Sequence, residues 1–389
     1  MERCLSLYIH IPFCMGRCDY CDFYSTQTGS FGRGFEEVRE QFVKRLLEDI
    51  RSKLEGVAFV PTVYVGGGTP SVLRESLGRL LEGLVRLLPN TPLEFTVEAN
   101  PESADEVFFT TCLSNKVTRV SLGVQTLYEK SRKAVNRLGD AAIIRESLAY
   151  AKRFFPHTFS VDFIAGLPFQ DEAILQNDLE QVLAFEPAHV SFYSLTLAEG
   201  TPLEKRMRIR KNATFTQRVD DLWLFGKDLL EHAGYIAYEV SNFSLKGKES
   251  LHNKRYWRME SWAGVGPSAS GTVIDDEKGT GVRLTVKSDV ALYLEKTEHD
   301  VEYLDRDALI KESLLMGFRS IDGPDEALFL KRFHKPIEAL IPQTIDAWRD
   351  KELFEQNRIA LTKEGILFLN RFLVEAFHEV CAHKQAQPV

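Results

Sequence analysis

The sequence lacks several features that define large classes of proteins. None of its apolar runs reaches the ~18–20 residues needed to span a bilayer, and its start has no basic segment followed by an apolar signal core. Basic residues are not in excess, because 48 Lys and Arg stand against 56 Asp and Glu, a net charge of −8. This balance argues against a general nucleic-acid binder. We therefore expect a cytoplasmic protein that binds no nucleic acid, a description compatible with peripheral membrane contact.

Cysteine is scarce and unevenly distributed. Six cysteines in 389 residues are too few for a secreted disulfide scaffold. Three of them stand alone and are expected to be ordinary thiols. The other three fall within HIPFCMGRCDYCDF, residues 10–23, at C-x3-C-x2-C spacing. They are Cys14, Cys18 and Cys21. Clustered thiols in a reducing compartment usually hold a metal or a redox centre.

Two kinds of metal centre are compatible with this spacing. Three thiolates on one loop can hold three corners of a four-iron cluster and leave the fourth corner open to another molecule. Zinc is the alternative, with three Cys ligands and one His, for which His10 and His252 are candidates. Structural zinc sites more often pair two C-x2-C knuckles, and the sequence has no second knuckle. The spacing favours an iron–sulfur cluster over zinc and over incidental thiols.

The first 200 residues alternate short apolar strands with helical periods. We predict a helix over 35–54, where apolar residues recur with helical spacing. The predicted strands are 5–11, 62–70, 93–101, 117–125, 159–168 and 189–196. Strands that alternate with helices imply parallel βαβ units. The expected fold is α/β, a partial (β/α)6 barrel of the TIM type, whose active face lies at the C-terminal ends of the strands.

Polar residues and glycines end these strands. The cysteines follow the first strand, the triplet GGG at 66–68 follows the second, and Glu98, Gln125 and Asp162 lie on the next three. Three glycines let a ligand approach the backbone closely, although a tight turn explains them equally well. Each polar residue also has a structural explanation, as a paired acid, a turn residue or a satisfied polar group. Convergence of five strand ends favours a binding site.

Six segments together resemble the radical S-adenosylmethionine (SAM) proteins of the coproporphyrinogen III dehydrogenase group, and most of all its haem-chaperone subgroup. They read YIHIPFCMGRCDYCDF, VYVGGGTPS, VEANPES, RVSLGVQT, VDFIAGLP and LHNKRYW, and the resemblance runs from Leu5 to about Leu373. It implies a [4Fe–4S] cluster with SAM on its open iron. It also implies an electron donor and reductive cleavage of SAM to a 5′-deoxyadenosyl radical.

The resemblance implies roles for individual residues. The cluster ligands would be Cys14, Cys18 and Cys21. The SAM-binding residues would be Tyr8, Tyr20, Gly67, Gly68, Thr69, Glu98, Gln125, Arg137 and Asp162. Some of these would contact a second SAM, as in the dehydrogenase branch. A solvated helix charge is the alternative explanation for Arg137.

Two departures favour the haem-chaperone subgroup over the dehydrogenases. The dehydrogenases carry a further Cys two residues after the third, where this chain has Phe23, and an N-terminal extension that this sequence does not show. The implied function is to bind haem and hand it to apo-haemoproteins, and coproporphyrinogen dehydrogenase activity is not expected. The alternative is an active radical-SAM oxidoreductase of the oxygen-independent coproporphyrinogen III dehydrogenase type.

The segment LHNKRYW matches an H-N-x-x-Y-W motif that the resemblance links to haem. Its residues are His252, Asn253, Tyr256 and Trp257. An imidazole can ligate haem iron and aromatic rings can flank a porphyrin. Equally, the aromatics can pack a loop onto the barrel around a satisfied His252. Many of the resembled proteins read G-A-H-G shortly afterwards, whereas residues 268–271 here read S-A-S-G, so an imidazole near position 270 is absent.

The chain changes character after about residue 300. Amphipathic helical stretches over 308–350 precede a segment, 353–377, that resembles a winged-helix module with a short hairpin and a helix capped by Thr362. Because this helix has no basic face, we expect it to pack or to dock a partner, not to read DNA. The predicted organisation is a radical-SAM barrel over 1–200, barrel completion with the HNxxYW segment over 201–300, and a small C-terminal helical, winged-helix-like domain over 301–389.

Overall fold

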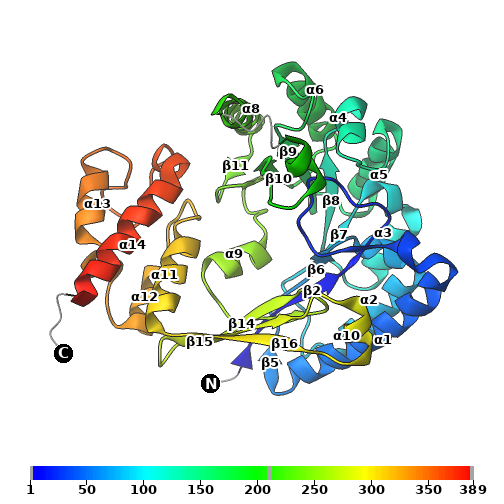
Figure 1. Ribbon diagram of the computed structural model, residues 1–389, viewed down its shortest axis with the longest axis horizontal. Helices are drawn as coiled ribbons and strands as arrows, with labels where there is room; N and C mark the ends of the chain where they lie inside the picture. Colours follow the sequence, from blue (N-terminus) through cyan, green and yellow to red (C-terminus); the bar gives the residue numbers. More distant parts are fainter. Residues whose placement is uncertain (1–2, 208–212, 386–389) are drawn as a thin grey trace.

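The computed structural model describes residues 3–207 and 213–385 (Figure 1). Its largest sheet has twelve strands in the order β11-β12-β10-β9-β8-β7-β6-β2-β13-β14-β15-β16. Six of them pair in parallel with their neighbours in chain order. These are β2 (Ser6–Ile11), β6 (Thr62–Gly67), β7 (Glu94–Ala99), β8 (Arg119–Gln125), β9 (Phe159–Ala165) and β10 (His189–Ser194). The outer two of the six pair onward with β13 and β12, which makes the predicted (β/α)6 barrel a partial one.

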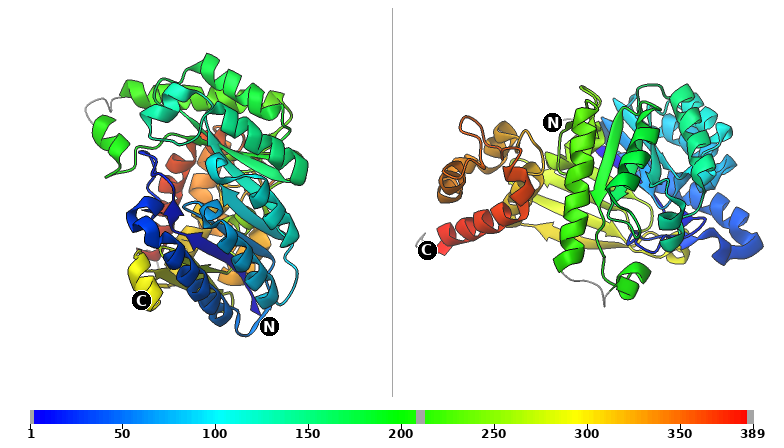
Figure 2. Two further views of the ribbon diagram at one scale, coloured as in Figure 1. Left: turned by 90° about the vertical axis from the view of Figure 1, so that its right-hand side faces the viewer. Right: turned by 90° about the horizontal axis from the view of Figure 1, so that it is seen from above.

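Helices connect the parallel strands and cover the outer face of the sheet (Figures 1 and 2). The longest is α1 (Phe35–Leu54), over the range predicted. The others are α2 (Glu75–Leu87), α3 (Glu106–Ser114), α4 (Glu129–Ala134), α5 (Ala141–Phe154) and α6 (Glu172–Leu183). An aspartate precedes α3, α5 and α6, and its side chain accepts hydrogen bonds from N–H groups of the first turn. These caps explain where the helices begin.

An antiparallel extension joins the barrel to the C-terminal helices. It consists of β13 (Trp262–Val265), β14 (Ser270–Asp275), β15 (Thr280–Val286) and β16 (His299–Leu304). In Figure 1 these strands run along the lower edge of the molecule toward α11 (Arg306–Gly317), α12 (Glu326–Phe333), α13 (Pro342–Arg349) and α14 (Leu369–Gln385). Helix α9 (Leu251–Trp257), which carries the HNxxYW motif, lies between the barrel and these helices. Helix α9 contacts both strand β6 of the barrel and helix α11 of the C-terminal part.

The remaining elements are short or peripheral. The strands are β1 (Arg3–Cys4), β3 (Phe13–Cys14), β4 (Thr26–Gln27), β5 (Val57–Phe59), β11 (Ile236–Ala237) and β12 (Asn242–Ser244). The helices are α7 (Pro202–Met207), α8 (Ala213–His232) and α10 (Val290–Glu295). Among the described helices, none combines the length and the apolar character that a membrane span requires.

Two main hydrophobic cores organise the chain. The larger fills the space between the sheet and its outer helices, and the second joins the C-terminal helices around Trp348 and Phe372. In this second part the final helix begins later than predicted. A 3₁₀ turn over Gly365–Phe368 comes first, and it is the Gly365 N–H that donates to the Thr362 hydroxyl, at 3.0 Å. The division of the chain into three segments stays a prediction.

Candidate functional site

Most of the predicted cluster and SAM residues meet in one cavity at the C-terminal ends of the parallel strands. Its volume is about 340 Å³. The predicted residues that line it are Cys14, Cys18, Tyr20, Cys21, Gly67, Gly68, Glu98, Gln125, Arg137 and Asp162. Two predicted residues lie elsewhere: Thr69 is buried behind Cys14, and Tyr8 lines a neighbouring groove. The placement is that of a site built from several strand ends, whereas the roles of these residues stay predictions.

The cysteine loop is anchored at both ends. Strand β3 carries Cys14 and pairs with β4, so the loop between them is closed at its base. Phe13 lies in the main core, with its ring 5.0 Å from that of Phe42. Inside the loop the Cys21 N–H donates to the Cys18 carbonyl at 3.1 Å. An apolar anchor next to a short tight turn therefore presents all three thiols to the cavity.

The three thiols that line the cavity are a suitable donor set for a cluster. Burial raises the pKa of Cys21 to about 11 and also raises the pKa of Cys14. A bound metal offsets this cost by stabilising the thiolates. Among the described residues no group of three or more His, Cys, Asp or Glu is placed to hold a single metal ion. In a four-iron cluster each thiolate binds a different iron, so the three thiols need not converge on one point.

The zinc alternative lacks its imidazole in this cavity. His10 lies outside the lining, with Nδ1 3.0 Å from the Tyr8 hydroxyl and Nε2 3.0 Å from the Tyr24 carbonyl oxygen. His252 also lies outside it. The lining therefore does not support the predicted zinc site with three Cys ligands and one of these two histidines.

The glycine triplet is required by close packing. A Cβ on Gly66 would lie 2.7 Å from Oε2 of Glu98, and one on Gly68 would lie 2.7 Å from the Phe13 carbonyl oxygen. Gly67 has φ +105°, a conformation that side chains rarely allow. Its N–H donates to Glu98 Oε2 at 3.1 Å. The triplet is thus both a turn and the wall that holds Glu98 at the cavity.

Two carboxyl groups at the cavity have raised pKa values. The pKa of Glu98 is raised to about 7, chiefly by burial and also by nearby Asp162, while hydrogen bonds from the Tyr64 hydroxyl and the Gly67 N–H act to lower it. Burial also raises the pKa of Asp162 to about 6, although Ser121 and Ser191 hydrogen-bond to it. A cationic ligand between these groups would favour their ionised forms. The electrostatics therefore suit a ligand that carries positive charge.

The raised pKa of Glu98 predicts that the stability of the folded protein depends on pH. Because its pKa in the folded state is raised from 4.5 to about 7, the favourable neutral form is fully present below pH ~4.5, and its contribution is lost as the pH rises through about 7. We expect Glu98→Gln to remove part of the fall in unfolding free energy between pH 5 and pH 8, on the order of 2 kcal/mol. Urea denaturation of both proteins at pH 5 and pH 8 measures this difference in unfolding free energy.

The exposed acid Glu82 supplies the control for this prediction. Glu82→Gln should leave the pH dependence unchanged, because that carboxylate lies on the surface of α2. Asp162 gives a slope of the same sign, and because its charge interacts with that of Glu98, the difference between the proteins reports Glu98 together with this interaction. Equal slopes in Glu98→Gln and the parent protein would contradict the assignment.

Gln125 and Arg137 complete the polar lining. Gln125 has φ +66°, and its buried side-chain oxygen has no hydrogen-bond partner in the described structure. Arg137 donates from Nη1 to Cys18 Sγ at 3.4 Å and from Nη2 to Asn100 Oδ1 at 2.7 Å. This position shows that Arg137 is not a solvated helix charge. An unpaired amide oxygen at the cavity wall fits a ligand that carries N–H donors.

Sequence reasoning missed several residues of this lining, among them Asn100 and Gly123. Asn100 bridges Arg137 to Thr69, donating from Nδ2 to the Thr69 hydroxyl at 2.9 Å. A Cβ on Gly123 would lie 2.8 Å from Nη2 of Arg137, so glycine leaves room for that guanidinium. Both residues stand in segments, VEANPES and RVSLGVQT, that carried the resemblance. The resemblance therefore pointed to these two segments, but which of their residues face the cavity depends on the curvature of the sheet.

The HNxxYW residues do not share one set of contacts: His252 and Tyr256 contact each other, whereas Asn253 and Trp257 contact other partners. His252 is buried, with Nδ1 2.8 Å from the Thr62 hydroxyl and Nε2 2.9 Å from the Tyr256 hydroxyl. Burial lowers the pKa of His252 to about 3. Trp257 lies under the Arg319 guanidinium, 4.9 Å from the ring centre, and Asn253 reaches the Tyr238 hydroxyl at 3.5 Å. His252 therefore offers no free nitrogen to a haem iron in this structure.

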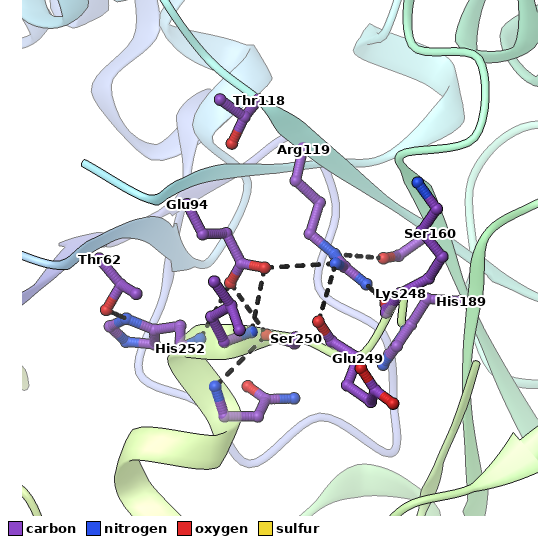
Figure 3. A network of polar contacts seen from close by, with 12 residues as sticks. Thr62, Glu94, Thr118, Arg119, Ser160, His189, Lys248, Glu249, Ser250 and His252 are labelled. Atoms are coloured by element: carbon purple, nitrogen blue, oxygen red, sulfur yellow. Dashed lines mark hydrogen bonds and ion pairs between the residues drawn. The ribbon is translucent and has the colours of Figure 1, made fainter. Parts of the chain in front are cut away.

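A buried network fastens this motif to the strands (Figure 3). Glu94, at the start of β7, accepts hydrogen bonds from the Leu251 and His252 N–H groups at 3.0 and 2.9 Å. Arg119, at the start of β8, lies 3.3 Å from Glu94 Oε2 and donates to the Lys248 carbonyl at 2.8 Å. The first turn of α9 is thus bound to the N-terminal ends of two strands, as the structural explanation of the motif expects.

Comparison with known proteins identifies relatives over nearly the whole chain. Residues 8–182 match the model of the Radical SAM superfamily. The chain is 33% identical over 383 residues to the heme chaperone HemW of Lactococcus lactis subsp. lactis, which covers 94% of this chain and 95% of that protein. It is 30% identical to the heme chaperone HemW of Escherichia coli, with 95% and 97% covered.

A solved structure has the same fold. Coproporphyrinogen III oxidase (HemN) from Escherichia coli, described as a radical SAM enzyme, superposes with a TM-score of 0.79 at 20% identity. The match covers 96% of this chain and 90% of that one. The predicted radical-SAM α/β fold is therefore confirmed.

Proposed function

The chain belongs to the HemW family within the radical SAM superfamily, and from this membership we propose that it is a haem chaperone that binds haem and hands it to apo-haemoproteins. The observation that carries the proposal is the similarity, over 94–95% of the chain, to proteins named heme chaperone HemW. The same proposal includes a [4Fe–4S] cluster, SAM, and an electron donor, and places the protein in the cytoplasm.

The cavity at the strand ends supports the cofactor part of this proposal. Cys14, Cys18 and Cys21 would hold the cluster, which supplies an electron for reductive cleavage of SAM when both are bound. Glu98 and the unpaired oxygen of Gln125 would accept hydrogen bonds from N–H groups of SAM. The side chains of the cavity would orient SAM, and their carboxylates would face its positive charge.

The alternative function is an oxidoreductase that acts on coproporphyrinogen III. The fold likeness to coproporphyrinogen III oxidase is compatible with it, but a likeness at 20% identity shows the fold alone. Phe23 stands where the dehydrogenases that the sequence resembles carry a further Cys. Phe23 therefore favours the chaperone function over the oxidoreductase function.

Haem binding and transfer test the proposal directly. We expect the anaerobically reconstituted protein to take up haem with a shift of the Soret band, and to lose it to apomyoglobin when the two are mixed. We also expect coproporphyrinogen III to remain unconverted in the presence of SAM and a reductant. Absorbance titration and chromatography of the tetrapyrroles measure these results.

Two outcomes would overturn the proposal. One is the absence of any Soret shift at haem concentrations that saturate apomyoglobin. The other is oxidative decarboxylation of coproporphyrinogen III with SAM consumed in proportion, which would replace the chaperone with the oxidoreductase. Apomyoglobin and haem without the chain serve as the control for unassisted transfer.

A further inference from the structure

A second hollow lies beside the cysteine cavity, between β2, α9, the antiparallel extension and α11. Its volume is about 450 Å³, within the ~300–1,000 Å³ that ligand pockets usually have. Its lining includes Tyr8, Phe23, Tyr24, Tyr256, Trp262 and Met316. We call it the aromatic groove. Four tyrosine and tryptophan side chains and one thioether make it a surface for a flat, largely apolar ligand.

The polar tips of these aromatic residues are already bound to the protein. The Tyr8 hydroxyl lies 3.0 Å from His10 Nδ1, and the Tyr256 hydroxyl lies 2.9 Å from His252 Nε2. Trp262 donates from Nε1 to the Ser270 carbonyl at 2.9 Å. Their orientations are therefore fixed before a ligand arrives, which lowers the entropic cost of binding.

The groove and the cysteine cavity share part of their wall. Asp22 and Phe23, which follow the third cysteine, line both. Phe23 is 64% exposed, the most exposed phenylalanine among the described residues. A ligand in the groove would therefore touch the loop that carries the cysteines, and an apolar ligand would cover Phe23.

Met316 is the residue of the groove best suited to bind a metal. It projects from α11 and is half-buried, and methionine sulfur is a known axial ligand of haem iron. The imidazole of His10, which also lines the groove, has both nitrogens engaged with Tyr8 and Tyr24. The Tyr24 hydroxyl accepts a hydrogen bond from the Val290 N–H at 3.1 Å. The thioether needs to break no such hydrogen bond in order to reach an iron atom.

We infer that the aromatic groove is the haem-binding site, with the porphyrin packed against Tyr24, Tyr256 and Trp262 and its iron ligated by Met316. His252 is then a positioning residue, because its bond to the Tyr256 hydroxyl holds one wall of the groove. The Tyr256 ring lies 4.9 Å from that of Trp262, so displacing it would disturb both. This assignment rests on the proposed haem-chaperone function and names the site at which it acts.

Substitution of Met316 tests the assignment on the full-length protein. Leucine has nearly the same volume, so Met316→Leu should fold normally. We expect the ferric haem complex to lose the sulfur-to-iron charge-transfer band, while the Kd rises no more than about tenfold because the porphyrin still buries its faces. The matched control is Met259→Leu, whose methionine is buried in the C-terminal core and should leave the spectrum unchanged.

A second variant adds a ligand instead of removing one. Ser270 lines the groove and is half-buried on β14, with its hydroxyl 3.1 Å from that of Thr285. We expect Ser270→His to place an imidazole near the iron and to convert the spectrum to that of a nitrogen-ligated haem. His252→Gln should weaken haem binding but keep the sulfur band, a result that a ligand role for His252 would not give.

The outcomes of these experiments distinguish an error in the proposed haem site from an error in the proposed function. If the parent protein binds no haem, the proposed function fails and this site with it. If haem binds but its spectrum is the same in the parent, Met316→Leu and Ser270→His, the chaperone function stands and the groove is wrong. Loss of the band in Met316→Leu but not in Met259→Leu supports the groove.

Discussion

Replacing any one of Cys14, Cys18 and Cys21 by alanine is expected to abolish the iron–sulfur cluster. After anaerobic reconstitution with iron and sulfide, the parent protein should be brown with absorbance near ~400 nm, and each variant should show none of it. The three thiols line one cavity, and the rest of the described lining contains no further cysteine or histidine. A variant would thus have two thiolates for a cluster that needs three. Absorbance and iron analysis measure the loss.

The exposed cysteine Cys4 provides the matched control. Cys4→Ala removes a thiol without touching the cavity, so its iron content and absorbance should equal those of the parent. Stoichiometric zinc without iron in the anaerobically purified protein would contradict the cluster. So would a variant such as Cys18→Ala that keeps the full absorbance.

The repeating part of the fold could be predicted from sequence because its signals are local. Apolar residues recur along each parallel strand, with glycine or polar residues at or near its end, and α1 has an apolar residue at every helical turn. The C-terminal ends of parallel strands must meet at one edge, which is why Glu98, Gln125 and Asp162 line the cavity with the cysteines.

Side-chain direction at single positions could not be predicted in the same way. Tyr8 stands on β2 between the cavity and the aromatic groove, and the curvature of the sheet decides which of them it lines. Thr69 supports Cys14 from behind, with the two side chains 3.4 Å apart. The lining of the groove comes from β2, α9, β14 and α11, which are separated by about 300 residues of sequence. No spacing pattern encodes such a combination.

His252 shows how a motif can have a structural explanation and a functional one together. Its two ring nitrogens hold Thr62 and Tyr256, and its backbone N–H is held by Glu94. The motif therefore joins the ends of the barrel strands to the wall of the groove. A change at Glu94 should consequently affect the whole arrangement.

Substitution of Glu94 by alanine is expected to cost about 3–5 kcal/mol of unfolding free energy. Glu94 and Arg119 are 5% and 7% exposed, so the arginine charge would remain buried without its partner. The N–H groups of Leu251 and His252 would lose their acceptor at the same time. Urea denaturation measures the loss, and amide hydrogen exchange at Leu251 and His252 should accelerate as α9 loosens.

Two comparisons make this expectation specific. Glu82 forms an exposed pair with Arg86 on α2, so Glu82→Ala should cost ~0–1 kcal/mol. The double variant Glu94→Leu with Arg119→Met should recover part of the lost stability, because no uncompensated charge is left in the interior. If Glu94→Ala were within ~1 kcal/mol of the parent protein, water would have to reach Arg119, and the network would not be what fastens α9 to the barrel.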